Sequence, residues 1–158
     1  MAQEMYKIEG PWGGAGGDEW TDGTYSNISG FTIGAGDCIH SIQVNYTLNC
    51  EGNQVNPVQA TRHGGGAGGQ QPTIQLESNE YLSKIEGEVG IQDGHNVVKS
   101  LTLIVSNTDK KVLDKPYHYG TKGDSTFKSD DGRKIVGFWG RSSGYVDKIG
   151  VYTVKNNH

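Results

Sequence analysis

The chain is predicted to be an all-β protein, and three observations support this fold class. Apolar and polar residues alternate with a period of two in several short segments, and no long stretch has the helical period. Glycine makes up 25 of the 158 residues and clusters between the apolar segments, as in turns. Short sequence patterns also recur along the chain. We therefore expect one domain over residues 1–158, with flexible ends at residues 1–6 and 155–158.

The predicted strands are short segments with one apolar side. They are HSIQVNYTL, PTIQLES and KSLTLIVS, followed by KIVGFWG and KIGVYTV, which are rich in β-branched and aromatic residues. The alternating apolar residues of the first three segments are Ile42, Val44, Tyr46 and Leu48, then Ile74 and Leu76, then Leu101, Leu103 and Val105. This alternation predicts half-buried strands, each with one face toward a core.

Two patterns recur and predict a threefold arrangement. The pentapeptide GGAGG occurs at Gly13–Gly17 and Gly65–Gly69, and a looser copy occurs at Tyr119–Ser125. A polar turn that leads into a strand recurs as GDCIHSI (Gly36–Ile42), NEYLSKI (Asn79–Ile85) and SGYVDKI (Ser143–Ile149). These repeats predict three units of about four strands each, arranged as small antiparallel sheets around one axis with a shared core.

Composition excludes several classes of function. The net charge of −4 lacks the basic surface of a nucleic-acid binder. No apolar run approaches the roughly 20 residues of a membrane span, and the first residues lack the apolar core of a signal peptide. We therefore expect a cytoplasmic protein without nucleic-acid or membrane partners, although a signal removed earlier leaves secretion open. Cys38 and Cys50 are expected to be free thiols. The histidines show no metal-ligand spacing, so no metal or cofactor is expected.

Three stretches carry a resemblance to a known family: GPWGGAGGDEWTDGTYSNI, then TRHGGGAGG with EYLSKIEGEVG, then IVGFWGRSSGYVDKIGVY. In this order and spacing, from about Lys7 to Val154, the chain resembles the jacalin-related lectins. The resemblance implies a β-prism I fold of three four-stranded Greek-key sheets with pseudo-threefold symmetry. It also implies non-catalytic, metal-independent sugar binding, and we expect a homodimer or higher homo-oligomer in which several weak sites act together.

In that family the sugar lies between the amino-terminal glycine loop and a closing G-x-x-x-D motif. Position by position, the resemblance implies a main sugar site made of Gly17, Gly144, Tyr145, Val146 and Asp147. Two positions depart from the family pattern. Ser143 stands where the family usually has glycine, and would be strained if φ were positive there. Gly144 stands where mannose binders often have Asp.

The chemistry of these residues suits a hexose. An ionised carboxylate only accepts hydrogen bonds, so Asp147 can bind two neighbouring hydroxyls, and the N–H groups of Gly144 and Tyr145 can donate to sugar oxygens. The Tyr145 ring is expected to cover one apolar face of the sugar. Each such bond nets about 1 kcal/mol, so one site should bind a monosaccharide with a dissociation constant on the order of millimolar. The resemblance favours mannose- or glucose-containing glycans over galactose, because the chain runs unbroken through Gly17 and Gly144 has no aromatic side chain.

A second candidate sugar site follows from the first turn motif. It consists of Asp37, Cys38, His40 and Gly69. His40 stands where the acid should be, so this loop lacks the two-oxygen acceptor. The middle motif has Ser83 at that position and is expected not to bind.

Alternative functions are a galactose-preferring lectin, or a non-catalytic interaction domain with a vestigial sugar site. A glycosidase is disfavoured because hydrolysis needs two facing carboxylates, and Asp18 is the one acid that could approach Asp147. Trp12, Phe138 and Trp139 are expected to be packing residues rather than platforms for a sugar.

Overall fold

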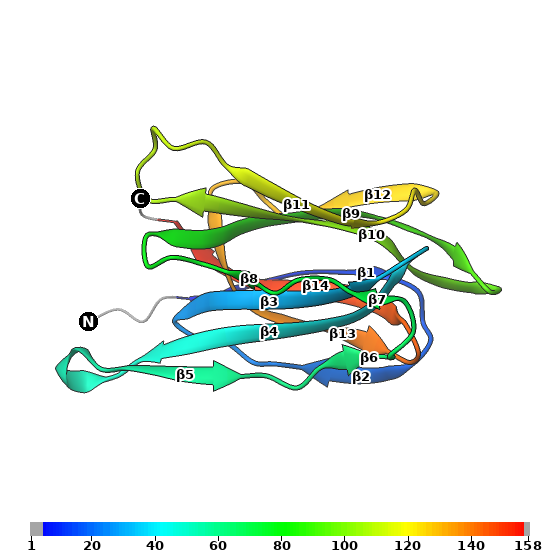
Figure 1. Cartoon of the computed structure of the whole chain (residues 1–158), viewed down its shortest axis with the longest axis horizontal. Helices are drawn as coiled ribbons and strands as arrows, with labels where there is room; N and C mark the ends of the chain where they lie inside the picture. Colours follow the sequence, from blue (N-terminus) through cyan, green and yellow to red (C-terminus); the bar gives the residue numbers. More distant parts are fainter. Residues whose placement is uncertain (1–4, 157–158) are drawn as a thin grey trace.

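The computed structural model describes residues 5–156 and consists of three antiparallel sheets (Figure 1). Residues 1–4 and 157–158 of the expected flexible ends lie outside the described residues. Lys155, which was expected in the flexible end, is instead the last residue of β14 and pairs with Arg133. Within residues 5–156, no helix has the length and apolar character of a membrane span.

Each sheet has four strand positions. In spatial order, the first sheet contains β1 (Lys7–Gly13), β14 (Val146–Lys155), β13 (Arg133–Ser142) and β2 (Asp18–Thr21). The second contains β5 (Val55–Gln59) with β6 (His63–Gly64), β4 (Ile39–Asn49), β3 (Asn27–Ala35), and β7 (Gly69–Gln70) with β8 (Ile74–Gln75). The third contains β11 (Lys115–Gly120), β10 (His95–Asn107), β9 (Glu80–Gln92) and β12 (Ser125–Lys128). One short 3₁₀ helix, Glu51–Asn53, follows β4.

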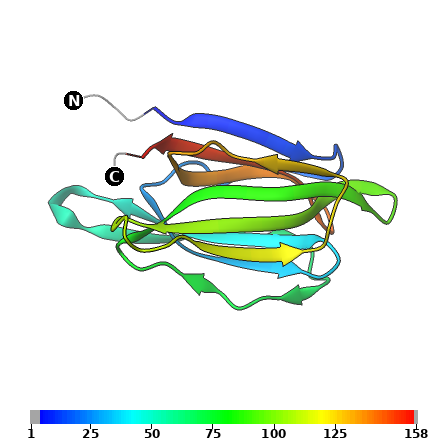
Figure 2. The same cartoon turned by 90° about the horizontal axis from the view of Figure 1, so that it is seen from above.

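The three sheets share one Greek-key order. In the second and third sheets, the third strand of the unit pairs with the second, the second with the first, and the first with the fourth. The first sheet has the same spatial order, but the chain begins with the third and fourth strands and ends with the first and second. Figure 2 shows the result, with the two ends of the chain, in blue and red, alongside each other as β1 and β14. The predicted threefold architecture is therefore confirmed.

The second sheet differs from the predicted four strands because both of its outer strands are interrupted. β5 and β6 both pair with β4, while β7 and β8 both pair with β3, which makes six strands in four positions. Pro72 lies between β7 and β8 and has no N–H for the ladder, which explains one of the two interruptions.

The core lies between the three sheets and is built from their alternating apolar residues. The middle strands β14, β4 and β10 contribute side chains with exposed fractions of 0–1%, among them Ile149, Val151, Ile42, Val44, Leu101 and Leu103. Burying such a side chain contributes roughly 1.5–3 kcal/mol. The predicted alternation is confirmed here, except that Leu48, near the end of β4, remains 39% exposed.

Three equivalent hydrogen bonds define one end of the prism. In each sheet a loop residue donates its backbone N–H to a carbonyl in the first half of a middle strand. The pairs are Gly14 to Asp147 at 2.8 Å, Gly65 to His40 at 2.9 Å and Thr121 to Lys99 at 3.0 Å. Asp147, His40 and Lys99 are therefore structural counterparts.

These same loop residues also join each sheet to the next one. A Cβ atom on Gly14 would lie 2.1 Å from the Asn96 carbonyl oxygen, and one on Gly65 would lie 2.6 Å from the Gly144 carbonyl oxygen. The Thr121 hydroxyl donates to the Asp37 carbonyl oxygen at 2.5 Å. The three loops thus interlock cyclically, which brings all three turn regions together at this end.

The prediction that the middle motif is equivalent to the other two is wrong. NEYLSKI leads into β9, the first strand of its unit, whereas GDCIHSI and SGYVDKI lead into second strands, β4 and β14. Ser83 lies within β9, where its hydroxyl is 2.7 Å from that of Ser106. The counterpart of Asp147 is Lys99, which the longer β9–β10 hairpin hides in the sequence.

Candidate functional site

The turn between β13 and β14 is closed by a backbone hydrogen bond. The N–H of Ser143 donates to the carbonyl of Tyr145 at 2.9 Å, and the turn between β3 and β4 closes in the same way, from Gly36 to Cys38 at 3.1 Å. Within residues 5–156, Asp93 is the one non-glycine residue with positive φ. Ser143 therefore carries no left-handed strain, and this departure from the family pattern leaves the shape of the turn intact.

The glycine loop between β1 and β2 lies against this turn because two of its residues have no side chain. Gly17 has a φ of +75°, and a Cβ atom there would lie 2.4 Å from the Ser142 carbonyl oxygen and 2.8 Å from Oδ1 of Asp147. A Cβ on Gly16 would lie 2.9 Å from Oδ2 of the same carboxylate. Any side chain at these two positions would occupy the space beside the acid.

The Asp147 carboxylate lies at the floor between the two loops. The residue is only 2% exposed, and its Oδ1 accepts a hydrogen bond from the Ser143 hydroxyl at 2.7 Å. In the described part of the chain, Oδ2 accepts no hydrogen bond from the protein. One carboxylate oxygen is thus occupied by Ser143, and the other is available to a ligand donor.

The remaining predicted residues of this site contribute backbone. Gly144 is exposed, and within residues 5–156 the N–H groups of Gly144 and Tyr145 have no partner in the protein. The Val146 side chain is fully buried in the core. The structure therefore brings Gly17, Gly144, Tyr145 and Asp147 together, whereas Val146 can offer a ligand only its backbone.

The Tyr145 ring is held by contacts with the other two turn regions, and its expected role as a cover for the sugar stays a prediction. Its hydroxyl donates to the Asp93 carboxylate, a hydrogen bond that raises the pKa of the phenol. Its ring lies 5.4 Å from that of His40, centroid to centroid. Tyr145 therefore connects its own turn to the other two turn regions.

Arg141 is a site residue that sequence reasoning missed. It lies in β13 opposite Glu19 of β2. Its guanidinium donates to the carbonyl oxygens of Gly16 at 3.2 Å and Gly17 at 2.7 Å, and forms an ion pair with Glu19 at 3.2 Å. It therefore fixes the glycine loop that faces Asp147. The only sequence signal was its place shortly before the turn motif.

The second candidate site has the same backbone but different chemistry. The His40 ring is buried, and a Cβ atom on Gly68 would lie 2.4 Å from the ring atom Cδ2. The ring Nε2 lies 3.8 Å from Sγ of Cys38, and the buried Nδ1 has no hydrogen-bond partner. The imidazole therefore fills the space beside the glycine loop. Asp37, the other predicted polar residue of this site, is exposed.

The prediction of Gly69 as the partner glycine is wrong by one residue. Gly68 has a φ of +73° and precedes β7, as Gly17 with a φ of +75° precedes β2. The two GGAGG copies are identical in sequence but not equivalent in structure, because the alanine falls at different positions in the two loops. The free-thiol prediction is confirmed for both cysteines, and burial raises the pKa of Cys38 to about 11.

The third repeat also lacks an acid at the position of Asp147. Lys99 occupies the position of Asp147 and directs its ammonium group to Gln92 Oε1, 2.8 Å away. Residues 5–156 contain no cluster of three or more His, Cys, Asp or Glu side chains arranged to hold a metal ion. Asp18, the acid considered as a second carboxylate, is exposed at the start of β2. Among these three equivalent positions, one presents a carboxylate.

Comparison with known proteins identifies the family. Residues 9–152 match the family model of the jacalin-like lectin domain. The chain belongs to the jacalin-like lectin family. It is 38% identical to an agglutinin of Castanea crenata over 96% of this chain, but it spans only 48% of that protein. It is 35% identical to jacalin-related lectin 19 of Arabidopsis thaliana, over 90% of this chain and 77% of that protein.

A solved structure supports the same fold. A mannose-specific jacalin-related lectin from Morus nigra, in complex with mannose, superposes with a TM-score of 0.79. The sequence identity is 32%, and the match covers 98% of this chain and 96% of the other. The predicted β-prism I fold is therefore confirmed.

Proposed function

We propose that this domain is a non-catalytic, metal-independent lectin that binds mannose- or glucose-containing glycans through one main site. The observation that carries the proposal is the Asp147 carboxylate, set between the glycine loop at Gly16 and Gly17 and the turn at Ser143. The free Oδ2 and the N–H groups of Gly144 and Tyr145 supply acceptors and donors that match adjacent sugar hydroxyls.

A mannose-type ligand is supported by two observations. The Morus nigra relative is a mannose-specific lectin. The chain also continues from β1 through Gly17 into β2 without a break, whereas the resemblance implies a cleaved chain with a free amino-terminal glycine at this position for galactose-specific members.

The absence of catalysis is part of the proposal. Glycoside hydrolysis uses two carboxyl groups about 5–9.5 Å apart, of which one donates a proton. The groups in contact with Asp147 are the Ser143 hydroxyl and the glycine loop. They can hold a hydroxyl-bearing ligand, but they provide no carboxylic acid to protonate a leaving group.

The test is a calorimetric titration of the purified chain with methyl α-mannoside, methyl α-glucoside and methyl α-galactoside, with and without EDTA. We expect millimolar binding of the mannoside and glucoside, a stoichiometry of one, weaker binding of the galactoside, and no effect of EDTA. A galactoside preference would overturn the assigned specificity, and a loss of binding in EDTA would overturn metal independence.

A second candidate function is an interaction domain with an inactive sugar site. The observation that favours it is the Ser143 hydroxyl, which occupies Oδ1 of an acid that is only 2% exposed. Failure of all three glycosides to bind at 50 mM would support this candidate against the lectin. Such an interaction domain, or a lectin with weak single sites, would gain avidity as a homo-oligomer, which sedimentation would detect.

A further inference from the structure

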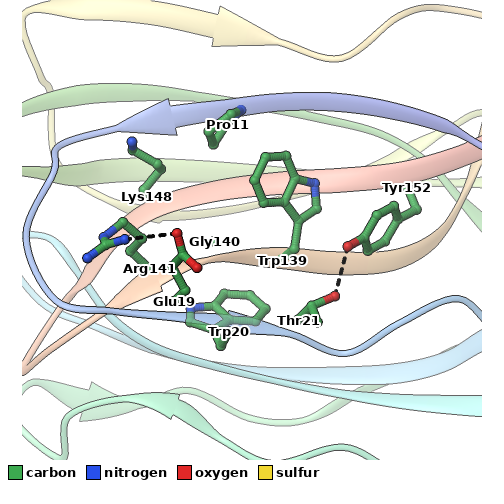
Figure 3. A pocket seen from close by; sticks show the side chains of 9 residues that line it. All are labelled: Pro11, Glu19, Trp20, Thr21, Trp139, Gly140, Arg141, Lys148 and Tyr152. Atoms are coloured by element: carbon green, nitrogen blue, oxygen red, sulfur yellow. Dashed lines mark hydrogen bonds and ion pairs between the residues drawn. The ribbon is translucent and has the colours of Figure 1, made fainter.

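The outer face of the first sheet carries a groove of about 580 Å³ (Figure 3). It runs across β2, β13, β14 and β1. The residues that matter for its chemistry are Glu19, Trp20, Trp139, Arg141, Lys148 and Tyr152. At one end of the view, Arg141 and Glu19 form an ion pair, and at the other, the hydroxyls of Thr21 and Tyr152 are 2.8 Å apart.

Trp139 forms the middle of this groove. A Cβ atom on Gly150 would lie 2.4 Å from Cε2 of the indole, so the ring rests directly on the Gly150 backbone. The indole N–H points to the Val151 carbonyl at 3.4 Å, and the half-buried ring lines the groove with its remaining surface. The expectation that Trp139 is a packing residue is confirmed for the face that lies on Gly150, while the rest of the ring surface lines the groove. A flat aromatic surface in a fixed orientation can pack against the C–H groups of a pyranose ring.

Charged groups surround this aromatic surface. The Glu19 side chain is 84% exposed and can accept hydrogen bonds, while Lys148 and Arg141 can donate them. Binding sites for small polar ligands commonly combine aromatic walls with a few placed polar groups. The chemistry of the groove therefore suits a carbohydrate.

Arg141 connects the groove to the glycine loop of the Asp147 site. The guanidinium of Arg141 holds the carbonyl oxygens of Gly16 and Gly17, whose other side faces the carboxylate, and the same residue lines the groove. Trp139 lies two residues before Arg141 in β13, about 7 Å from it at the usual strand rise. A glycan that leaves the Asp147 site over the glycine loop would therefore pass Arg141 and reach Trp139.

We propose that this groove binds the second and third sugar residues of a mannose-containing oligosaccharide whose terminal residue occupies the Asp147 site. The proposal rests on the proposed lectin function and deepens it, because it assigns a preference for oligosaccharides over single sugars. Trp139 is the stacking surface, and Glu19 and Lys148 are the polar contacts.

The test is a titration with methyl α-mannoside and with a linear mannotriose. Wild type should bind the trisaccharide about tenfold more tightly than the monosaccharide, as expected for one added stacking contact. Trp139→Ala should abolish this preference and leave monosaccharide affinity unchanged. The trisaccharide alone should alter the tryptophan emission of wild type. The matched control is His118→Ala, an exposed residue in a groove on the outer face of the third sheet, which should behave as wild type.

One further variant keeps the test decisive if Trp139→Ala fails to fold. The variant Lys148→Ala changes only a charged group that lines the groove, and should reduce trisaccharide affinity alone. A trisaccharide preference retained in either folded variant would overturn the proposal. So would a change of oligomeric state in Trp139→Ala without a change of sugar preference, because the groove would then be an interface between copies. If wild type binds neither sugar, the lectin function itself fails, and the groove proposal fails with it.

Discussion

The turns Ser143–Asp147 and Gly36–His40 have the same backbone and differ in the group they place beside a glycine loop. Each closes with an N–H to carbonyl bond from its first to its third residue, and each receives a bond from a glycine-loop N–H at its fifth residue. At Asp147 the space beside Gly17 holds a carboxylate with one free oxygen. At His40 the space beside Gly68 holds a buried imidazole.

This difference separates the requirements of the fold from those of binding. The loops at Gly14, Gly65 and Thr121 interlock the three sheets, so the fold needs all three repeats. Sugar binding needs an acceptor at one position of one repeat. The side chains at Asp147, His40 and Lys99 can therefore differ without altering the scaffold that holds them.

The largest expected effect comes from removal of the acid. Asp147→Asn keeps the shape of the side chain but removes its charge and one acceptor, and we expect mannoside affinity to fall by at least about 100-fold, since charge-assisted bonds are the strong ones. The matched variant His40→Asn should bind as wild type. Calorimetry measures both, and thermal denaturation confirms that both are folded. Equal losses in the two variants would contradict the comparison.

The glycines of the two loops provide the next largest effect. Gly17→Ala and Gly68→Ala each place a Cβ at a positive φ and about 2.4 Å from a neighbouring atom, so each should lower the free energy of unfolding by about 1–2 kcal/mol or more. Only Gly17→Ala should also lose sugar binding, because its Cβ lies beside Oδ1 of Asp147. Denaturant unfolding and calorimetry separate the two effects. Sugar binding that survives Gly17→Ala in a folded protein would contradict the site.

A variant that adds an acid to the His40 turn tests whether the carboxylate is the group that the second loop lacks. His40→Asp replaces the imidazole with an acid. This turn already has Gly36 and Asp37, the residue types that the family pattern has at these two positions. The equivalent positions of the main site, Ser143 and Gly144, depart from that pattern. We expect the calorimetric stoichiometry to rise from one to two, with the new site in the millimolar range. A stoichiometry that stays at one would mean that the backbone of the second loop does not suffice for binding.

The smallest effect concerns Ser143. Its hydroxyl donates to Oδ1 of Asp147, and Ser143→Ala frees this acceptor for the ligand. A hydrogen bond to a carboxylate nets roughly 1.5–3 kcal/mol, and water replaces part of it in the free variant, so mannoside affinity should rise by a few-fold, up to about tenfold. Gly36→Ala, at the equivalent position of the other turn, should leave mannoside affinity unchanged. Weaker binding by Ser143→Ala would show that the hydroxyl itself contacts the sugar.

The sequence supported the architecture better than the details of the site. Alternating residues such as Ile42 and Val44 report burial directly, and the repeated glycine loops indicated three units. Matching letters misplaced Gly68 by one residue and missed Lys99, because loop lengths differ between repeats. Arg141 could not be predicted, since its contacts are carbonyl oxygens at the other end of the chain. The sequence also does not show which face of β13 Trp139 occupies, because hydrophobicity alone does not separate the two faces of a strand.

The most direct test of the central claim is a crystal structure of the chain soaked with methyl α-mannoside. We predict one sugar per chain, with its hydroxyls on the Asp147 carboxylate and on the N–H groups of Gly144 and Tyr145, beside Gly17. The turns at His40 and Lys99 should contain no sugar. A sugar bound at either of those turns, or none at Asp147, would contradict the account.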